Sequence, residues 1–118
     1  MPRTKNSVSS KKRRKKILKR AKGFRQGRSK LFKRAKEFSE KGLTYAFMHR
    51  RKKKRDFRRL WISRISAACK LNGISYNEFI YGIKKLGINL NRKMLADIAF
   101  NHPENFTLLV NQIKGKTG

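Results

Sequence analysis

The chain has 118 residues and a formal net charge of +28, because it holds 34 Lys and Arg residues against 6 Asp and Glu residues. This charge excludes an ordinary free globular protein, which would repel itself, and it requires a dense polyanion as partner. Nucleic acid fits that description better than an acidic membrane surface. The single cysteine, Cys69, excludes an internal disulfide and suits a reducing compartment. Because Cys69 lies on the apolar side of a helical pattern, we interpret it as a small buried residue rather than a reactive thiol.

The charge is unevenly distributed along the chain. Residues 1–59 hold 26 Lys and Arg residues and 3 acidic residues, which gives a net charge of +23. Residues 60–118 hold 8 Lys and Arg residues and 3 acidic residues, which gives a net charge of +5. The first half is therefore mainly electrostatic, and the second has the balance of an ordinary globular domain. We divide the chain into a basic extension at residues 1–56, made of a tail, a short helix and the first part of a long helix, and a small globular helical domain at residues 57–118.

The first elements precede that long helix. Residues 1–10 are polar and predict an unstructured tail. Residues 11–22 predict a short helix, which should form only against an anion because its like charges repel at i,i+4. Gly23 and Gly27 bracket a turn.

A long helix is predicted at residues 29–72, with Ser29 as its N-cap and Gly42 as the place of any bend. No proline interrupts this stretch. Apolar residues recur along it at helical spacings of three and four. They are Leu31, Ala35, Phe38, Gly42 and Tyr45, followed by Phe57, Trp61, Ile65 and Ala68.

The end of the long helix and the start of the next carry strong local signals. Gly73 suits the left-handed position after a helix end. Ser75 and Glu78 form an S-x-x-E capping box, and Ile74 and Phe79 stand where a hydrophobic staple would place them.

Two further helices complete the predicted domain. Gly87 should end the second helix, Asn91 should cap the third, and Pro103 fits the first turn of the fourth. The apolar faces expected are Phe79, Ile80, Ile83 and Leu86, then Met94, Leu95, Ile98 and Ala99 with Leu90 as a staple, and then Phe106, Leu109, Val110 and Ile113. No alternating strand pattern occurs, so the fold class is all-α: a long basic N-terminal helical extension followed by a small compact helical C-terminal domain.

Basic residues interleaved with aromatics form the most informative pattern. The runs Lys11–Lys16 and Arg50–Arg55 each present six consecutive cations, which can neutralise phosphates. The aromatics between or beside them could stack on unpaired bases or could pack against other protein, and the sequence leaves both readings open. They are Phe24, Phe32, Phe38, Tyr45, Phe47 and Phe57.

Catalysis and nucleotide hydrolysis are not supported. The segment from Gly23 to Ser29 has three residues between its glycines and then Arg-Ser, whereas a phosphate loop needs four and then Lys-Ser or Lys-Thr. Such a turn could still hold a single phosphate. His49 and His102 have no partner at metal-ligand spacing, and six scattered acids offer no acid–base pair. We therefore expect no enzyme, with no catalytic, cofactor or metal site.

Several segments together resemble one known family. They are residues 55–68, 72–76 and 91–99, with residues 21–25, 45–46 and 50–51 in the first half. With these segments the chain closely resembles, over nearly its whole length, the bacterial and organellar large-subunit ribosomal protein family L-twenty. The Arg-Arg-Leu-Trp-Ile segment at residues 58–62 is specific to it.

This resemblance implies a basic extension threaded through ribosomal RNA and a small helical domain on the solvent side of the subunit. The implied function is that of a structural constituent of the large subunit, which binds 23S-type ribosomal RNA directly and early and promotes assembly. The implied partners are that RNA and neighbouring large-subunit proteins. We expect that the chain binds no membrane, small-molecule substrate or cofactor and that it forms no homo-oligomer. The implied location is the ribosome in the bacterial cytoplasm, with an organelle matrix or stroma as the alternative.

The residues expected to contact RNA fall into groups along the chain. The resemblance implies phosphate contacts from the long helix, by Arg50, Arg51, Arg55, Arg58, Arg59 and Arg64. It implies that a turn formed by Asn72, Gly73, Ser75 and Tyr76 can touch RNA. It also implies a basic edge of the globular domain, formed by Lys84, Lys85, Arg92 and Lys93. The composition adds Lys11, Lys12, Arg13, Arg14, Lys15, Lys16, Lys22, Phe24, Arg25, Arg28, Lys30, Arg34, Lys52 and Lys54. Capping and packing explain Gly73 and Ser75 equally well. We assign Trp61 to the core, because it shares a face with Phe57 and Ile65.

Two other functions deserve comparison. A DNA-compacting protein of the nucleoid or histone type would have the same charge, but such tails usually repeat Lys, Ala and Pro, and this chain has two prolines and no repeat. A membrane-active cationic peptide would need a broad apolar helix face near the N-terminus, where Ile17, Leu18 and Ala21 are too few. No apolar run approaches the length of a membrane span.

Overall fold

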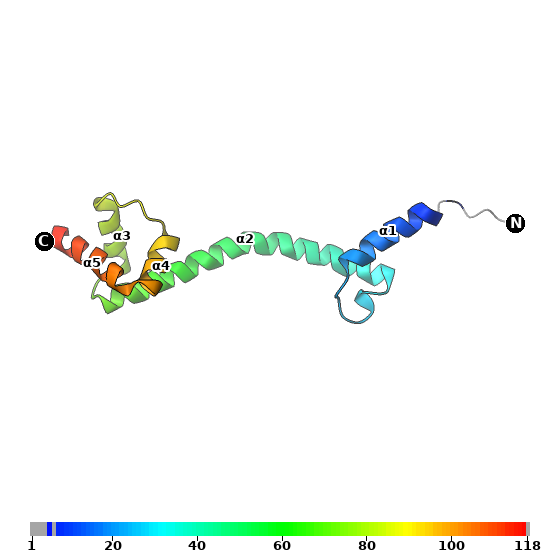
Figure 1. The fold of residues 1–118 in the computed structure, drawn as a ribbon, viewed down its shortest axis with the longest axis horizontal. Coiled ribbons are helices and arrows are strands. Elements are labelled where there is room, and N and C mark those ends of the chain that lie inside the picture. Colours follow the sequence, from blue (N-terminus) through cyan, green and yellow to red (C-terminus); the bar gives the residue numbers. More distant parts are fainter. Residues whose placement is uncertain (1–4, 6, 118) are drawn as a thin grey trace. The chain divides into compact units, whose positions relative to one another are not determined.

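The computed structural model describes Lys5 and residues 7–117, and all regular structure among them is helical, which confirms the all-α prediction. Figure 1 shows the order of these elements. They are α1 (Ser7–Arg20), a single 3-10 turn η1 (Gln26–Arg28), α2 (Phe32–Leu71), α3 (Tyr76–Lys85), α4 (Arg92–Asn101) and α5 (Pro103–Thr117). None of the described helices is both long and apolar enough to span a bilayer.

The chain divides into two compact units, Met1–Arg51 and Lys52–Gly118, and α2 contributes residues to both. The first unit holds α1, η1 and the first part of α2. The second holds the rest of α2 with α3, α4 and α5.

The first unit departs from the prediction at its start. α1 begins at Ser7, so residues 7–10 are helical and not part of an unstructured tail. Serines are favoured around a helix start, where they can bond to unpaired amides, and they add no charge to the repulsion among the lysines that follow. The rest of the predicted tail, residues 1–4 and 6, lies outside the described residues.

Ser29 is not the N-cap of the long helix, which begins at Phe32. The Ser29 hydroxyl donates to the carbonyl of Gln26 at 3.2 Å, so it serves the 3-10 turn instead. The amides of Lys30 and Leu31 both donate to the Gly27 carbonyl, at 3.3 and 2.9 Å. The local bond of the Ser29 side chain thus takes the place of helix capping, and α2 begins three residues later than predicted.

The end of α2 follows the prediction closely. Gly73 has a φ of +67°, a left-handed conformation that suits glycine. The amide of Ile74 donates to the Cys69 carbonyl at 3.1 Å, and the amide of Gly73 donates to the Lys70 carbonyl at 3.2 Å. This pair of bonds is a Schellman motif, which satisfies the last carbonyls of the helix.

The predicted caps of the later helices are also present. The Glu78 amide donates to Ser75 Oγ at 3.3 Å, and the Ser75 amide donates to Glu78 Oε2 at 3.1 Å, so the capping box is complete. Asn91 Oδ1 accepts from the Met94 amide at 2.9 Å. Pro103 is the first residue of α5.

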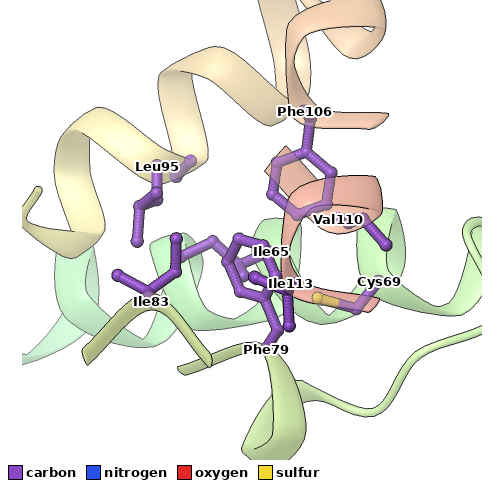
Figure 2. Close-up of a cluster of buried hydrophobic side chains, with 9 residues drawn as sticks. Ile65, Cys69, Phe79, Ile83, Leu95, Phe106, Val110 and Ile113 are labelled. Atoms are coloured by element: carbon purple, nitrogen blue, oxygen red, sulfur yellow. The ribbon is translucent and has the colours of Figure 1, made fainter. Parts of the chain in front are cut away.

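The core of the second unit draws on all four of its helical segments (Figure 2). The rings of Phe79 and Phe106 lie 4.8 Å apart at its centre. The buried residues are Ile65 and Cys69 from α2, Phe79 and Ile83 from α3, Leu95 and Ala96 from α4, and Phe106, Val110 and Ile113 from α5. Ile80, Leu86, Ile98, Ala99 and Leu109 are partly buried against this cluster.

Two residues of the second unit that were predicted for apolar faces lie outside this core, as do Leu31 and Tyr45 of the first unit, which are exposed. Met94 is 49% exposed, because α4 turns Leu95 and Ala96 inward and leaves Met94 at the edge of its buried face. Phe57 is 43% exposed, and its ring lies 6.2 Å from that of Trp61. Trp61 itself is half-buried and packs against the cluster, which makes it a boundary residue of the core.

Candidate nucleic-acid interface

The expected contact residues lie on most of the helices and their connections. The run Lys11–Lys16 is on α1. The connection to α2 holds Lys22, Phe24, Arg25, Arg28 and Lys30, and α2 itself holds Arg34, Arg50, Arg51, Lys52, Lys54, Arg55, Arg58, Arg59 and Arg64. Asn72, Ser75 and Tyr76 surround the turn into α3, Lys84 and Lys85 are near its end, and Arg92 and Lys93 begin α4. All of them are exposed except Asn72, Tyr76 and Arg92, which are half-buried.

The exposed cations have few acids to pair with. The chain has 6 acidic residues for 34 Lys and Arg residues, so most of the positive charge cannot be neutralised within it. Arg34 and Glu37 form an ion pair at 3.4 Å, but both side chains are largely exposed and such pairs contribute little. Consecutive cations on a helix also point around its whole circumference, since a turn takes about 3.6 residues. A polyanion could therefore approach α1 and the middle of α2 from several directions.

Several aromatic rings carry a cation of this chain on one face. The Arg28 guanidinium lies 4.2 Å from the centre of the Phe38 ring, and that of Arg14 lies 5.1 Å from the centre of Phe32. Further along α2, Arg51 lies 4.7 Å from the ring centre of Phe47. These contacts place arginine side chains over aromatic rings.

A pocket of about 570 Å³ opens in the first unit. One wall is the loop between α1 and η1, and the other is a single face of α2, where the contributing residues are spaced by three, one and three. The lining residues are Gly23, Phe24, Arg25, Arg28, Phe38, Lys41, Gly42 and Tyr45. Three cations and three aromatic rings therefore surround one cavity.

In the second unit, some of the expected contact residues already form hydrogen bonds at the ends of helices. The Asn72 side-chain amide donates to the Ala68 carbonyl at 2.8 Å, and the Asn72 backbone carbonyl accepts from Lys114 Nζ at 2.7 Å. Ser75 is engaged in its capping box. The turn is thus held mainly by its own bonds, and its side chains are less available to a ligand than the sequence suggested.

Tyr76 and Arg92 are brought together although they are far apart in sequence. Arg92 Nε donates to the Tyr76 hydroxyl at 3.0 Å, which ties the start of α3 to the start of α4. Lys93 follows directly on the exposed side of α4. This bond fixes the position of the guanidinium that the domain presents beside Lys93.

A second pocket, also of about 570 Å³, lies between α2 and α4. Trp61, Arg64, Asn91, Lys93, Met94, Ala96 and Asp97 line it. Arg64 lies 5.0 Å from the ring centre of Phe100. The structure therefore gathers Arg64 and Lys93, two of the expected contacts, at one hollow of the domain surface.

The thiol and the potential metal ligands complete the description of these surfaces. Burial raises the pKa of the Cys69 thiol to about 11, so the thiol stays protonated at neutral pH. Within Lys5 and residues 7–117 no three His, Cys, Asp or Glu residues gather in a way that could hold a metal ion. What this surface can do is bind phosphates with its cations and stack bases on its rings.

Comparison with known proteins decides the family. The family model described as "Ribosomal protein L20" matches residues 3–109. The chain belongs to the ribosomal protein L20 family. This confirms the resemblance to the L-twenty family that the sequence carries.

Relatives named "Large ribosomal subunit protein bL20" match the chain over nearly its full length. The protein of Natranaerobius thermophilus is 54% identical over 114 residues, covering 97% of each chain. That of Bacteroides thetaiotaomicron is 54% identical over 114 residues, covering 97% of this chain and 98% of its own. That of Trichlorobacter lovleyi is 56% identical over 106 residues, covering 90% of this chain and 91% of its own.

Several residues at these surfaces of the protein were not predicted from the sequence. Lys41 and Gly42 line the first pocket, Phe100 carries Arg64, and Lys114 bonds to the turn at Asn72. The spacing of Phe38, Lys41, Gly42 and Tyr45 does mark one helix face. What the sequence did not reveal is that the loop before η1 folds against that face.

Proposed function

We propose that this L20 family member is a structural, non-enzymatic constituent of the large ribosomal subunit. It binds 23S-type ribosomal RNA directly and promotes assembly of the subunit. Family membership and the names of its relatives support the ribosomal role. The observation that carries direct RNA binding is the set of exposed cations on α1 and α2, for which the chain holds too few acids.

The two parts of the chain have different roles in this proposal. The extension at residues 1–56 supplies phosphate contacts, which give affinity without sequence information. The domain at residues 57–118 has caps and a packed core, and contacts within it hold side chains such as Arg64 and Arg92 in position. Fixed side chains can read the shape of a particular RNA site.

The partners proposed are large-subunit ribosomal RNA and neighbouring ribosomal proteins of the same subunit, with one copy of this chain per particle. No small-molecule substrate or cofactor takes part. The place of action is the ribosome, in the cytoplasm of a bacterium or in the matrix or stroma of an organelle.

Salt dependence tests direct RNA binding. If roughly ten phosphates are neutralised, affinity for a large-subunit RNA segment should fall on the order of a thousandfold or more between about 50 and 200 mM salt. A triple variant, Arg55→Gln, Arg58→Gln and Arg59→Gln, should lower the slope of log affinity against log salt by about two to three. Lys70→Gln is the matched control, because Lys70 is exposed on the same helix but is not an expected contact. A flat salt dependence would contradict the proposal.

Co-sedimentation separates the ribosomal role from a DNA-compacting one. The chain should stay with large ribosomal subunits after a moderate salt wash, and excess duplex DNA should not remove it. A DNA-compacting protein would leave the subunits and appear with the DNA.

A further inference from the structure

We propose that the pocket of the first unit captures one unpaired nucleobase of RNA together with an adjoining phosphate. This proposal rests on RNA being the partner of the chain and names what one site takes from it. The site comprises Phe24, Arg25 and Arg28 from the loop and η1, with Phe38, Lys41 and Tyr45 from α2. We call it the loop pocket.

The loop pocket has the size of a small-molecule site. Its volume of about 570 Å³ falls within the roughly 300–1,000 Å³ typical of ligand pockets. A double helix cannot enter such a space, whereas a single base turned out of its stack can. RNA-binding proteins take unpaired bases in this way, against aromatic rings or arginine planes.

Two rings of the loop pocket remain accessible as stacking surfaces. Phe24 is 36% exposed and Tyr45 is 45% exposed, although both rings are large and apolar. The Tyr45 ring is stacked with His49, at 5.8 Å between centres and 28° between planes, which limits its rotation. A ring held in this way loses less conformational entropy when a base stacks on it.

The third ring supports an arginine plane. Arg28 lies 4.2 Å from the centre of the Phe38 ring, the shortest of the cation–ring distances among the described residues. A guanidinium stacked on a ring is oriented and keeps its donors at its edge. Arg28 can therefore cover a base with its outer face or bond to a phosphate with its edge.

The charge of the loop pocket favours a nucleotide over other occupants. Arg25, Arg28 and Lys41 line it, and no acidic residue does. An acidic protein side chain would satisfy the cations but would offer no flat ring to Phe24 and Tyr45. A nucleotide supplies both a flat base and a negative charge.

Gly42 fits this site by its size. It lies inside α2, where glycine is less favourable than alanine. A Cβ atom at Gly42 would meet nothing within 4 Å, so no packing contact requires its small size. Since Gly42 lines the loop pocket, a larger side chain there would occupy the space that a base needs.

The experiment fills the pocket without removing a charge or a ring. The full-length chain is bound to a hairpin RNA with one bulged adenosine, and to the same hairpin with an abasic nucleotide at the bulge. The backbone phosphates of the two hairpins are identical. The wild-type chain should prefer the adenosine by about fivefold or more, because stacking of one base contributes roughly 1–3 kcal/mol.

Gly42→Leu should abolish this preference and leave binding of the abasic hairpin unchanged. Gly115→Leu is the matched control, because Gly115 lies in α5 with nothing within 4 Å and far from this pocket in sequence. It should keep the wild-type preference. Arg28→Lys retains the charge and loses the stacked plane, so it should reduce the preference without changing the salt dependence. Circular dichroism of each variant reports whether α2 has kept its helicity.

The outcomes separate this inference from the proposed function. If Gly42→Leu keeps the adenosine preference, or if the wild-type chain shows none while binding large-subunit RNA in a salt-dependent way, the loop pocket does not capture bases and the ribosomal role stands. If the wild-type chain binds large-subunit RNA no better than transfer RNA, the proposed function itself fails.

Discussion

Gly82 of α3 lies so close to Ile113 of α5 that a Cβ atom on Gly82 would overlap the Ile113 Cγ2 atom and lie 3.0 Å from Cγ1. Both residues are buried, and Ile113 belongs to the core cluster. The missing side chain of Gly82 thus sets how closely α3 and α5 pack.

Gly82→Ala should destabilise the second unit by about 1–3 kcal/mol, because the added methyl forces Ile113 or the backbone to move. This cost exceeds the gain of roughly 1 kcal/mol in helix propensity. Denaturant unfolding followed by circular dichroism gives the free energy. Gly115→Ala, a glycine in α5 with open space around it, should be neutral or slightly stabilising. Equal behaviour of the two variants would show that α3 and α5 do not pack as described.

Glu78 should make the stability of the domain sensitive to acid. Its pKa is lowered, first by the hydrogen bond from the Ser75 amide and then by that from the Ser75 side chain. A carboxylate with a lowered folded-state pKa stabilises the fold above its ordinary pKa of about 4.3 and loses this contribution as pH falls through the lowered value. Glu78→Gln should therefore show a weaker loss of stability than the wild type below about pH 4.5. Parallel pH profiles of the two proteins would contradict this account.

Cys69 should be unreactive in the folded protein. Its side chain is fully buried, and burial raises the thiol pKa to about 11. An aromatic disulfide reagent at pH 7.5 should modify it only after denaturant is added. Because the folded-state pKa is raised, the contribution of the protonated thiol is complete below its ordinary value and is lost as pH rises toward 11. Cys69→Ala should lose less stability over that alkaline range, and rapid labelling of the native chain would overturn the assignment.

Trp61→Ala should destabilise the domain by about 2 kcal/mol, less than the roughly 3–5 kcal/mol of a fully buried Trp. Trp61 is only half-buried against the core, and the same ring lines the pocket that contains Arg64 and Lys93. Leu108→Ala is a suitable control, because Leu108 is 61% exposed and should affect stability little. If stability is unchanged while RNA affinity collapses, Trp61 is a stacking residue and not part of the core.

Discrimination among RNAs should reside in the second half of the chain. A fragment of residues 55–118 should select a large-subunit RNA segment over excess transfer RNA, because its core and caps lie within residues 65–113 and hold its side chains in place. A fragment of residues 1–54 should not distinguish among RNAs that each offer unpaired bases, since phosphate contacts carry no sequence information and stacking accepts any base. Competition binding of both fragments measures this. Equal discrimination by the first fragment would place the recognition surface in the extension.

The helix ends of the second unit could be predicted from the amino-acid sequence. The left-handed glycine at Gly73, the capping box of Ser75 and Glu78, and the cap at Asn91 were all predicted. Each depends on residues at most five positions apart, so the residues that form it can be read together in the sequence. The same local reasoning failed at Ser29, where the bond to Gln26 is just as short in sequence and competes with capping.

Which helix faces pack against one another could not be predicted in the same way. Helical spacing marks an apolar face but does not say how far each residue turns inward, so Met94 and Phe57 were assigned to it and lie exposed. Gly82 packs against Ile113 although the two residues are far apart in the sequence. The loop pocket likewise forms between a loop and a helix face that no local sequence pattern pairs. Such contacts depend on the packing of whole helices and loops, and packing is a property of the folded volume rather than of neighbouring residues.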